Sequence, residues 1–183
     1  MNLVYATTNQ HKLAGANQAL TEADLTFVAP KLSLPDLPEI QSDDQKAVSV
    51  DKARKYYDLL KCPLVVMDSG LFVEALRGFP GVYTKYALDT IGIANIIRLL
   101  DSNTNAYTQR TVTYFDGIEP TTFTLKVPGH LSTQPRGDNG RDYDKYFVVD
   151  GADKTIAEMS TVEKTEITAK VWRDLAAWLR KRD

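Results

Sequence analysis

The order of strand-like and helix-like segments constrains the fold of this chain more than any other feature of its sequence. Apolar runs typical of strands occupy residues 2–7 and 25–29, and helical patterns occupy residues 10–22 and about 44–61. Between them, the proline- and acid-rich stretch over 30–44 is predicted to be a loop. Strands that alternate with helices in this way are typical of an α/β protein.

The second half of the chain adds a hairpin to this pattern. Residues 107–116 and 121–127 alternate around the turn DGIEP, which predicts an antiparallel pair of strands. The last helix is predicted over roughly 161–181, and a capping box of Ser160 and Glu163 opens it. We therefore expect a mixed, twisted sheet flanked by helices.

The centre of the chain is predicted to hold a buried strand over residues 64–67. This strand is expected to turn at Asp68-Ser69-Gly70 and to continue extended as far as Leu76. A glycine- and proline-rich turn, RGFPGVY, and a helix over residues 89–101 follow it. Because no repeat or linker interrupts the 183 residues, they are interpreted as one domain, 1–183.

Composition and charge exclude several classes of protein. Hydrophobic residues make up 43% of the chain and charged residues 25%, which is enough to bury a core. The formal net charge of −2 gives no general attraction to nucleic acid or to an anionic membrane. The single cysteine, Cys62, excludes an intramolecular disulfide and a cysteine-based zinc site, and it fits a reducing compartment. No apolar run is long enough to span a bilayer and no signal peptide is recognisable, so we expect a cytoplasmic protein.

The first strand runs into a short turn of hydroxyl and amide side chains with one lysine. Backbone N–H groups at a helix start bind anions, and a phosphate would offset the unfavourable position of a lysine in the first helical turn. The alternative is a common asparagine N-cap with a solvated lysine, and the glycines of a Walker loop are missing. The candidate phosphate-binding residues of this turn are Thr7, Thr8, Asn9, Gln10, His11 and Lys12.

Two carboxylates are candidate metal ligands. Asp68 lies at the C-terminal end of a predicted buried strand, where α/β folds bind ligands. Glu39 lies in the proline-rich loop and becomes a candidate only if the fold brings it near Asp68. Carboxylate oxygens suit Mg²⁺, which keeps waters and substrate phosphates among its ligands. The alternative for Asp68 is a structural Asp-Ser-Gly turn.

Further lysines and one tyrosine have both a functional and a structural interpretation. Lys85 follows the Gly-Phe-Pro-Gly turn, and Lys164 and Thr168 lie one turn apart near the start of the last predicted helix. Taken alone, each lysine is better explained as a solvated surface charge. Tyr143, in a charged loop, could stack on a base or pack in a core.

Taken together, these segments resemble the inosine-triphosphate pyrophosphatase family, whose members hydrolyse nonstandard purine nucleoside triphosphates. The similarity covers nearly the whole chain, and the blocks follow the family's order and spacing. The most specific block is DSGLFVEALRGFPGVY, which matches the family's Asp-Ser-Gly-Leu and Ala-Leu-x-Gly-x-Pro-Gly-x-Tyr signatures. The other matching segments are Thr7, Asn9 and Lys12 in the opening turn, Glu39 in LPDLPEIQ, Lys52-Ala53-Arg54, and TIAEMSTVEK.

The resemblance implies two lobes with a central cleft, a homodimer, and hydrolysis of a nucleoside triphosphate to a monophosphate and pyrophosphate. It implies Mg²⁺ as the cofactor, with Mn²⁺ as an alternative, held by Glu39 and Asp68. The implied catalytic residues are Asp68, which would orient or deprotonate the attacking water, with Lys12 and Lys52. The other residues that it implies at the substrate are Ser69, Lys85, Arg141, Tyr143, Asp144, Lys164, Thr168 and Lys170.

The sequence departs from this family in the half that reads the base. Met67 stands where the family usually has an acid, and Arg141 stands where it has a base-stacking phenylalanine. Thr168-Ala169-Lys170 replaces the family's Ser-His-Arg, so hydrogen bonds to the purine are lost. We therefore expect a weakened or shifted base preference, with Arg141 stacking on the base instead of an aromatic ring.

Three other functions are alternatives at this stage. A nucleotide-binding protein of the same fold that has lost turnover would bind a triphosphate without releasing pyrophosphate. A septum-associated pyrophosphatase for pyrimidine or modified nucleotides usually opens with Ser-x-x-Arg, which is absent here. A dimeric scaffold without a ligand would leave the lysines and acids without a purpose.

Overall fold

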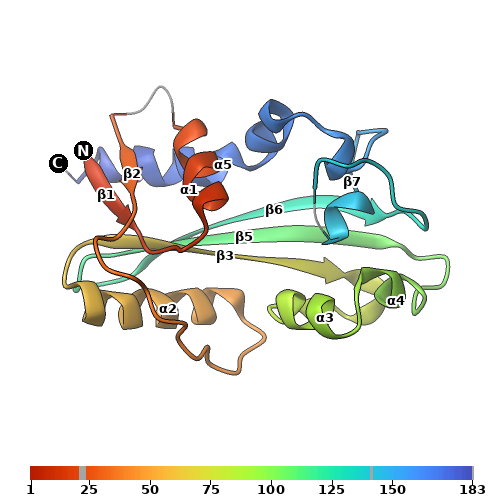
Figure 1. Ribbon diagram of the computed structural model, residues 1–183, viewed down its shortest axis with the longest axis horizontal. Coiled ribbons are helices and arrows are strands. Elements are labelled where there is room, and N and C mark those ends of the chain that lie inside the picture. The colour runs from red at the N-terminus through yellow and green to blue at the C-terminus, as the bar shows by residue number, and fades with distance from the viewer. Residues whose placement is uncertain (21–23, 141, 183) are drawn as a thin grey trace. The chain divides into compact units, whose positions relative to one another are not determined.

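The computed structural model describes residues 1–20, 24–140 and 142–182, and it has the α/β architecture that the sequence predicts (Figure 1). No helix within these ranges is both long enough and apolar enough to cross a membrane. In chain order, the elements are β1 (Asn2–Tyr5), α1 (Gln10–Gln18), β2 (Thr26–Val28), α2 (Gln45–Leu60), β3 (Leu64–Val73), η1 (Glu74–Leu76), β4 (Pro80–Gly81), α3 (Thr84–Thr90), α4 (Ile93–Ile97), β5 (Asn105–Phe115), β6 (Thr121–Leu131), η2 (Asp142–Lys145), β7 (Phe147–Val149), η3 (Ile156–Glu158) and α5 (Thr161–Leu179), where η denotes a 3-10 helix.

The chain forms two compact units. Unit 1 comprises Met1–Asp68, Arg110–Leu125 and Thr165–Asp183, and unit 2 comprises Ser69–Gln109 and Lys126–Lys164. The strands β3, β5 and β6 and the helix α5 contribute residues to both units. The central cleft implied by the family resemblance stays a prediction.

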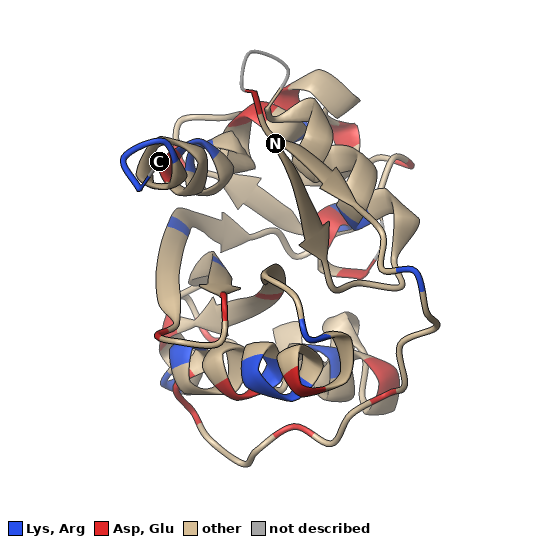
Figure 2. Cartoon of the chain, turned by 90° about the vertical axis from the view of Figure 1, so that its left-hand side faces the viewer, with Lys and Arg blue, Asp and Glu red and all other residues tan. Residues whose placement is uncertain are grey.

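Charged residues of both signs are interspersed along the chain. Figure 2 shows both signs of charge on the helices and loops and few charged positions on the strands, in agreement with the formal net charge of −2. A site for an anionic ligand therefore has to gather its positive charge locally.

The sheet is mixed, as predicted. Its strands are ordered β2-β1-β3-β5-β6-β7, and β4 pairs with β3. β1 is parallel to β2 and β3, whereas β4 and β7 are antiparallel to β3 and β6 respectively. The pairing of β1 with β3 ends with Tyr5 opposite Val65, so Asp68 lies beyond the end of β1, where the chain leaves the sheet towards α1.

Helix α2 is attached to the sheet by buried hydrogen bonds between polar side chains. Thr111 Oγ1 donates to Gln45 Oε1 at 3.1 Å, and Thr113 Oγ1 donates to Ser49 Oγ at 2.9 Å. All four residues are buried, and Gln45 and Ser49 are one helical turn apart. Directional bonds of this kind fix both the rotation of α2 about its axis and its position along β5.

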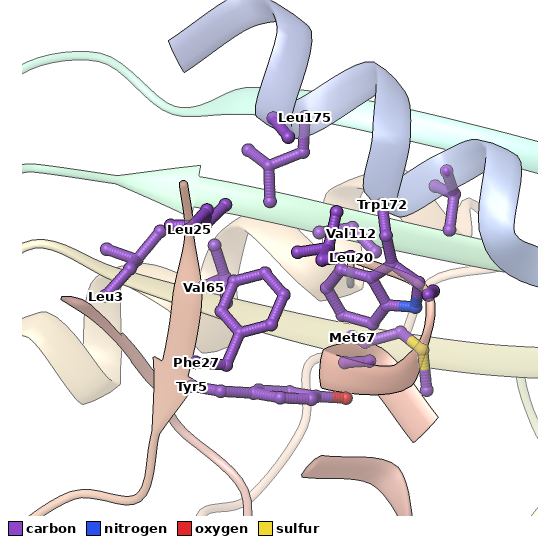
Figure 3. Close-up of a cluster of buried hydrophobic side chains, with 14 of the residues drawn as sticks. Leu3, Tyr5, Leu20, Leu25, Phe27, Val65, Met67, Val112, Trp172 and Leu175 are labelled. Carbon is purple, nitrogen blue, oxygen red and sulfur yellow. The ribbon is translucent and has the colours of Figure 1, made fainter. Parts of the chain in front are cut away.

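The other face of the sheet in unit 1 packs around three aromatic rings (Figure 3). The ring centroids of Tyr5, Phe27 and Trp172 lie between 5.0 and 5.9 Å apart. Val65 and Met67 of β3 belong to the same cluster, together with apolar residues of α1 and α5. We call this set the aromatic cluster; with Val112 and Tyr114 of β5, it joins β1, β2, β3, β5, α1 and α5.

Alternation along β3 decides which helix each side chain faces. Val65 and Met67 belong to the aromatic cluster, whereas Leu64 and Val66 pack in a separate cluster with Ala53 of α2. Successive side chains of a strand point to opposite faces of the sheet. In unit 1, therefore, α1 and α5 cover one face and α2 covers the other (Figure 1), and Asp68 points towards α2.

Unit 2 has its own apolar core. Its fully buried members include Leu71, Ile96, Leu131 and Phe147. Gly70 allows β4 to approach β3 closely, because a Cβ atom at this position would collide with the carbonyl oxygen of Gly81. The glycine of the Asp-Ser-Gly segment thus has a packing role within the sheet.

The turn predicted at Asp68-Ser69-Gly70 is wrong. β3 runs without interruption from Leu64 to Val73, and the 3-10 helix η1 then occupies the residues expected to be extended up to Leu76. An Asp-Ser-Gly segment carries a turn signal in isolation. Here β4 pairs with this part of β3, and tertiary pairing overrides the local preference.

The helix predicted over residues 89–101 is also wrong. The chain forms two short helices instead, α3 and α4, and they are separated at Gly92. The backbone of Gly92 has a φ angle of 76°, which ends a right-handed helix and which glycine adopts without strain. The apolar spacing that suggested one helix reflects the burial of Ile93 and Ile96 in α4.

Other element boundaries differ by a few residues. The first helix ends at Gln18, and part of the range predicted up to 22 lies outside the described residues. β6 continues to Leu131 rather than ending at 127. The predicted capping box is confirmed, because the Ser160 backbone N–H donates to Glu163 Oε2 at 2.8 Å and the Glu163 N–H donates to Ser160 Oγ at 3.3 Å.

Candidate functional site

The turn between β1 and α1 is stabilised by hydrogen bonds from its own side chains. Asn9 Oδ1 accepts from the backbone N–H groups of His11 (3.0 Å) and Lys12 (3.2 Å), so the predicted N-cap is confirmed. The Asn9 N–H donates to Thr7 Oγ1 at 3.1 Å. Two amides that could have bound a phosphate are therefore already bonded to Asn9. The exposed residues of the turn are Thr8, Asn9, Gln10 and His11.

Lys52 of α2 connects the two predicted metal ligands. Its ammonium group forms an ion pair with Asp68 Oδ1, and a second one with Glu39 Oε1 at 2.5 Å. The Asp68 side chain is 14% exposed and the Glu39 side chain 50% exposed, so the pair lies at the boundary between interior and solvent. The structure thus brings Glu39 near Asp68, which was the condition for its candidacy.

Lys12 belongs to the same group of charges. Burial lowers the pKa of its ammonium group below the ordinary value of 10.5, and the Asp68 carboxylate opposes this shift whereas the Lys52 ammonium adds to it. For Lys52, burial also favours the neutral form, but the charge and hydrogen bond of Asp68 outweigh it and raise its pKa. Two cations and two carboxylates, those of Lys12, Lys52, Glu39 and Asp68, therefore share one site within unit 1.

The second carboxylate oxygen of Asp68 fits a divalent cation. Oδ2 is buried and has no hydrogen-bond partner among the described residues, although buried polar atoms nearly always have one. The described residues contain no group of three or more His, Cys, Asp or Glu side chains that could hold a metal. Mg²⁺ commonly takes only one or two carboxylates and completes its shell with water and phosphate oxygens. Glu39 and Asp68 match that donor set.

Two further side chains of α2 hold the loop that carries Glu39. Lys55 Nζ donates to the Pro38 carbonyl at 2.7 Å, and Tyr56 Oη donates to the Pro35 carbonyl at 3.3 Å. Sequence reasoning missed both residues. Their signal was the helical spacing from Lys52, because residues three and four positions apart lie on the same side of a helix.

Arg110 of β5 was also missed. Its charge contributes to lowering the pKa of Lys12, which places it among the neighbours of the site. The sequence signal was a lone cation inside an otherwise apolar and threonine-rich strand.

Several of the predicted substrate-binding residues lie in unit 2. Lys85 lies on the surface of α3 and pairs with Asp89 at 2.6 Å. Tyr143 and Asp144 lie in η2, where the Tyr143 ring packs against the apolar core of unit 2. Arg141 lies outside the described residues.

Two more predicted substrate-binding residues are the unit 2 residues at which the chain passes from one unit to the other. Ser69 is exposed and directly follows Asp68 in β3, and Lys164 is half-buried in the first turn of α5. The substrate contacts of all these unit 2 residues stay predictions.

The segment of α5 predicted to read the base has a mixed environment. The Thr168 hydroxyl donates to the Thr165 carbonyl at 3.2 Å, and the exposed Lys170 pairs with Asp174 at 2.6 Å. Ala169 is fully buried in the aromatic cluster. Position 169, where the family has a histidine, is therefore a core position in this structure.

A hollow elsewhere in unit 1 shares none of these residues. It has a volume of about 430 Å³ and lies at the start of β1 and β3. Its lining residues include Met1, Asn2, Cys62, Pro63, Asp116 and Arg182. It is therefore separate from the group formed by Lys12, Lys52, Glu39 and Asp68.

Comparison with known proteins decides the family. The family model described as the Ham1 family matches residues 3–172. The chain belongs to the Ham1 family. A dITP/XTP pyrophosphatase of Thermococcus kodakarensis is 37% identical over 185 residues, covering 99% of this chain and 98% of that protein. A dITP/XTP pyrophosphatase of Hyperthermus butylicus is 38% identical over 188 residues, covering 98% and 95% respectively.

Solved structures of Ham1 proteins agree with this fold. A Ham1 protein from Coxiella burnetii has a TM-score of 0.85 and 25% sequence identity, and the match covers 99% of both chains. The resemblance identified from the motifs is thus confirmed. The range matched by the Ham1 family includes Lys12, Glu39, Lys52 and Asp68.

Proposed function

We propose that this Ham1-family chain is a Mg²⁺-dependent pyrophosphatase that converts nonstandard purine nucleoside triphosphates to monophosphates and pyrophosphate. The observation that carries the proposal is the grouping of Lys12, Lys52, Glu39 and Asp68 in one site. Full-length similarity to proteins named dITP/XTP pyrophosphatase supports the reaction and the class of substrate.

The two lysines bind the triphosphate in this proposal. A triphosphate brings several negative charges, and the ammonium groups of Lys12 and Lys52 offset them as charge accumulates on the leaving pyrophosphate. Binding also reduces the cost of burying the Lys12 ammonium group, which the Asp68 carboxylate compensates only in part. The first turn of α1 adds its positive dipole end.

Glu39 and Asp68 would hold Mg²⁺, with Mn²⁺ as the alternative, either directly or through water. When bound, the ion would acidify the attacking water and offset phosphate charge. In this structure the Lys52 ammonium pairs with both carboxylates. The donor set is therefore already arranged around a positive charge.

Asp68 acts on the attacking water. The Oδ1 atom remains paired with Lys52, so Asp68 would hold the ion only through water, and Oδ2 accepts a hydrogen bond and then the proton from the water that attacks the α-phosphorus. The bond between the α-phosphorus and the bridging oxygen breaks, and pyrophosphate leaves with its charge offset by the lysines.

Met67 does not disturb this arrangement. Its side chain is buried in the aromatic cluster, on the face of β3 opposite to Asp68. An acid at position 67 would therefore face the aromatic cluster and not Lys52. The proposed shift in base preference rests instead on α5, where Ala169 is buried and Lys170 is paired with Asp174.

The proposal also includes a cytoplasmic location and a homodimer. The single cysteine favours a reducing compartment, and the family resemblance implies the dimer.

A panel of nucleoside triphosphates tests the proposed function. Purified protein with Mg²⁺ is incubated with dITP, XTP, the common purine triphosphates and the pyrimidine triphosphates, and pyrophosphate and orthophosphate are measured separately. We expect pyrophosphate release from dITP and XTP, and only weak discrimination against the common purine triphosphates. Binding without any product would instead identify a nucleotide-binding protein, and orthophosphate alone would mean that a different bond is broken.

Variants of Asn9 separate helix capping from phosphate binding. Asn9→Ala removes the acceptor for two backbone amides and is expected to lower the free energy of unfolding by about 1 kcal/mol. Asn9→Asp keeps a good cap but adds a negative charge beside the polyphosphate. We therefore expect Asn9→Asp to retain stability in urea unfolding and to raise KM. A KM equal to that of the wild type in Asn9→Asp would mean that this turn does not contact phosphate.

Substrate affinity is expected to fall at alkaline pH as Lys12 loses its proton. Because its pKa is lowered from 10.5 in the folded chain, Lys12 loses its proton at a pH below that value, and KM is expected to rise in that window. The stability of the unliganded protein is expected to change in the favourable direction over the same pH range. The unfolded chain binds more protons at this site in the same window, so the contribution to stability increases with pH.

Lys12→Arg is the matched control, because arginine stays charged over the whole range. Its KM is expected to be flat where that of the wild type rises. If the two profiles rise together, another group is responsible for the pH dependence.

A further inference from the structure

Arg110 lies in β5 on the side of the sheet that the aromatic cluster occupies. Its neighbours Thr111 and Thr113 bond to α2, whereas Val112 and Tyr114 pack in the aromatic cluster. Side chains of a strand alternate between the two faces, so Arg110 shares the face of Val112 and Tyr114. This is the face covered by α1, whose first turn carries Lys12.

The charge of Arg110 acts on two groups near the end of β1. Burial and the Lys52 ammonium lower the pKa of Lys12, and Arg110 lowers it further. Burial raises the pKa of the Tyr5 hydroxyl, and Arg110 is the largest charge that opposes this rise. Both effects agree with the strand alternation, which puts Arg110 on the face of the sheet that carries Tyr5 and is covered by α1.

The Tyr5 hydroxyl independently indicates a missing partner. Tyr5 is fully buried, and its hydroxyl has no hydrogen-bond partner among the described residues. Figure 3 shows this hydroxyl pointing towards the end of the aromatic cluster where Met67 lies. Buried hydroxyl groups nearly always have a partner, so a donor is available here to a bound group.

We infer that Arg110 and the Tyr5 hydroxyl form, with Lys12, an anion subsite that binds the polyphosphate of the substrate. The identity of this ligand rests on the proposed function. The planar guanidinium binds two phosphate oxygens at once, which a lysine cannot do. The Tyr5 hydroxyl donates to the same anion, directly or through one water.

This subsite would also lower the cost of burying the Lys12 ammonium group, which the Asp68 carboxylate compensates only in part. Lys52 and Asp68 lie towards the α2 face, so the subsite adds a second set of phosphate contacts from the α1 face. The polyphosphate would then be held from two directions around the end of β1.

Binding of inorganic pyrophosphate tests the subsite without turnover. Calorimetry of the full chain without Mg²⁺ gives the dissociation constant for this probe. We expect Arg110→Met to weaken binding roughly tenfold to a hundredfold, Arg110→Lys to have an intermediate effect, and Tyr5→Phe to weaken binding about two- to tenfold. Arg180→Met, at an exposed position, removes the same charge and is expected to bind like the wild type.

The outcomes distinguish the subsite from the proposed function. If both Arg110 variants bind pyrophosphate like the wild type while Lys12→Met binds it weakly, the subsite is wrong and the proposed function stands. A lower melting temperature of Arg110→Met with an unchanged dissociation constant assigns Arg110 a structural role and also overturns the subsite. If Arg110→Met does not fold, Arg110→Lys decides. A wild type that releases no pyrophosphate from any nucleoside triphosphate overturns the proposed function itself.

Discussion

Replacing Asp68 with asparagine is expected to reduce pyrophosphate release from dITP about 10²–10⁴-fold, the usual contribution of a positioned acid or base. The amide has nearly the shape of the carboxylate but cannot take a proton from water. It also removes the negative charge that is paired with Lys52. Steady-state rates with saturating substrate and Mg²⁺ measure the effect.

A matched control tests whether the loss is specific to the site. Asp58→Asn, on the exposed surface of α2, removes the same charge from a pair with Lys61 and is expected to leave the rate unchanged. Circular dichroism of both variants checks the fold. An Asp68→Asn protein that retains the rate of the wild type would contradict the role of this carboxylate.

Replacing Lys52 with methionine is expected to change turnover, stability and the response to Mg²⁺. Turnover falls about 10²–10³-fold, because a cation that offsets developing phosphate charge is lost. The free energy of unfolding without metal falls by about 1–3 kcal/mol, since the partly buried Asp68 carboxylate loses its ion pair. Addition of Mg²⁺ should then stabilise the variant more than the wild type, because Glu39 and Asp68 are no longer paired with an ammonium group.

Thermal unfolding with and without Mg²⁺ measures this difference. Lys46→Met, at an exposed position in the first turn of the same helix, is the matched control and should respond to Mg²⁺ like the wild type. Equal Mg²⁺ stabilisation of Lys52→Met and the wild type would argue against Glu39 and Asp68 as metal ligands.

Local signals predicted those parts of the fold that depend on neighbouring residues. The Asn9 cap and the Ser160–Glu163 capping box depend on a few consecutive residues, and both are confirmed. The Asp-Ser-Gly turn was wrong because β4, which pairs with β3, returns only after the chain has turned. A sequence window does not contain such a partner.

The residue types of the site could be predicted from the sequence, but the directions of its side chains could not. The family resemblance selected Glu39, Lys52 and Asp68, and the structure brings them together. It did not show that Met67 and Asp68 point to opposite faces, or that Arg110 shares the face of Met67. Side-chain direction in a strand follows from the register of pairing and from the helices that pack on each face, and neither can be deduced from one sequence.

The bonds from Lys55 and Tyr56 to the backbone of the Glu39 loop have a mechanical consequence. One carboxylate of the site is carried by an irregular segment, yet that segment is tied to the same helix that carries Lys52. Because buried hydrogen bonds also fix α2 on β5, this loop, Lys52 and the sheet behave as one rigid body. The spacing between Glu39 and Asp68 is therefore set before any ligand binds, so a metal ion would meet a preorganised pair of carboxylates.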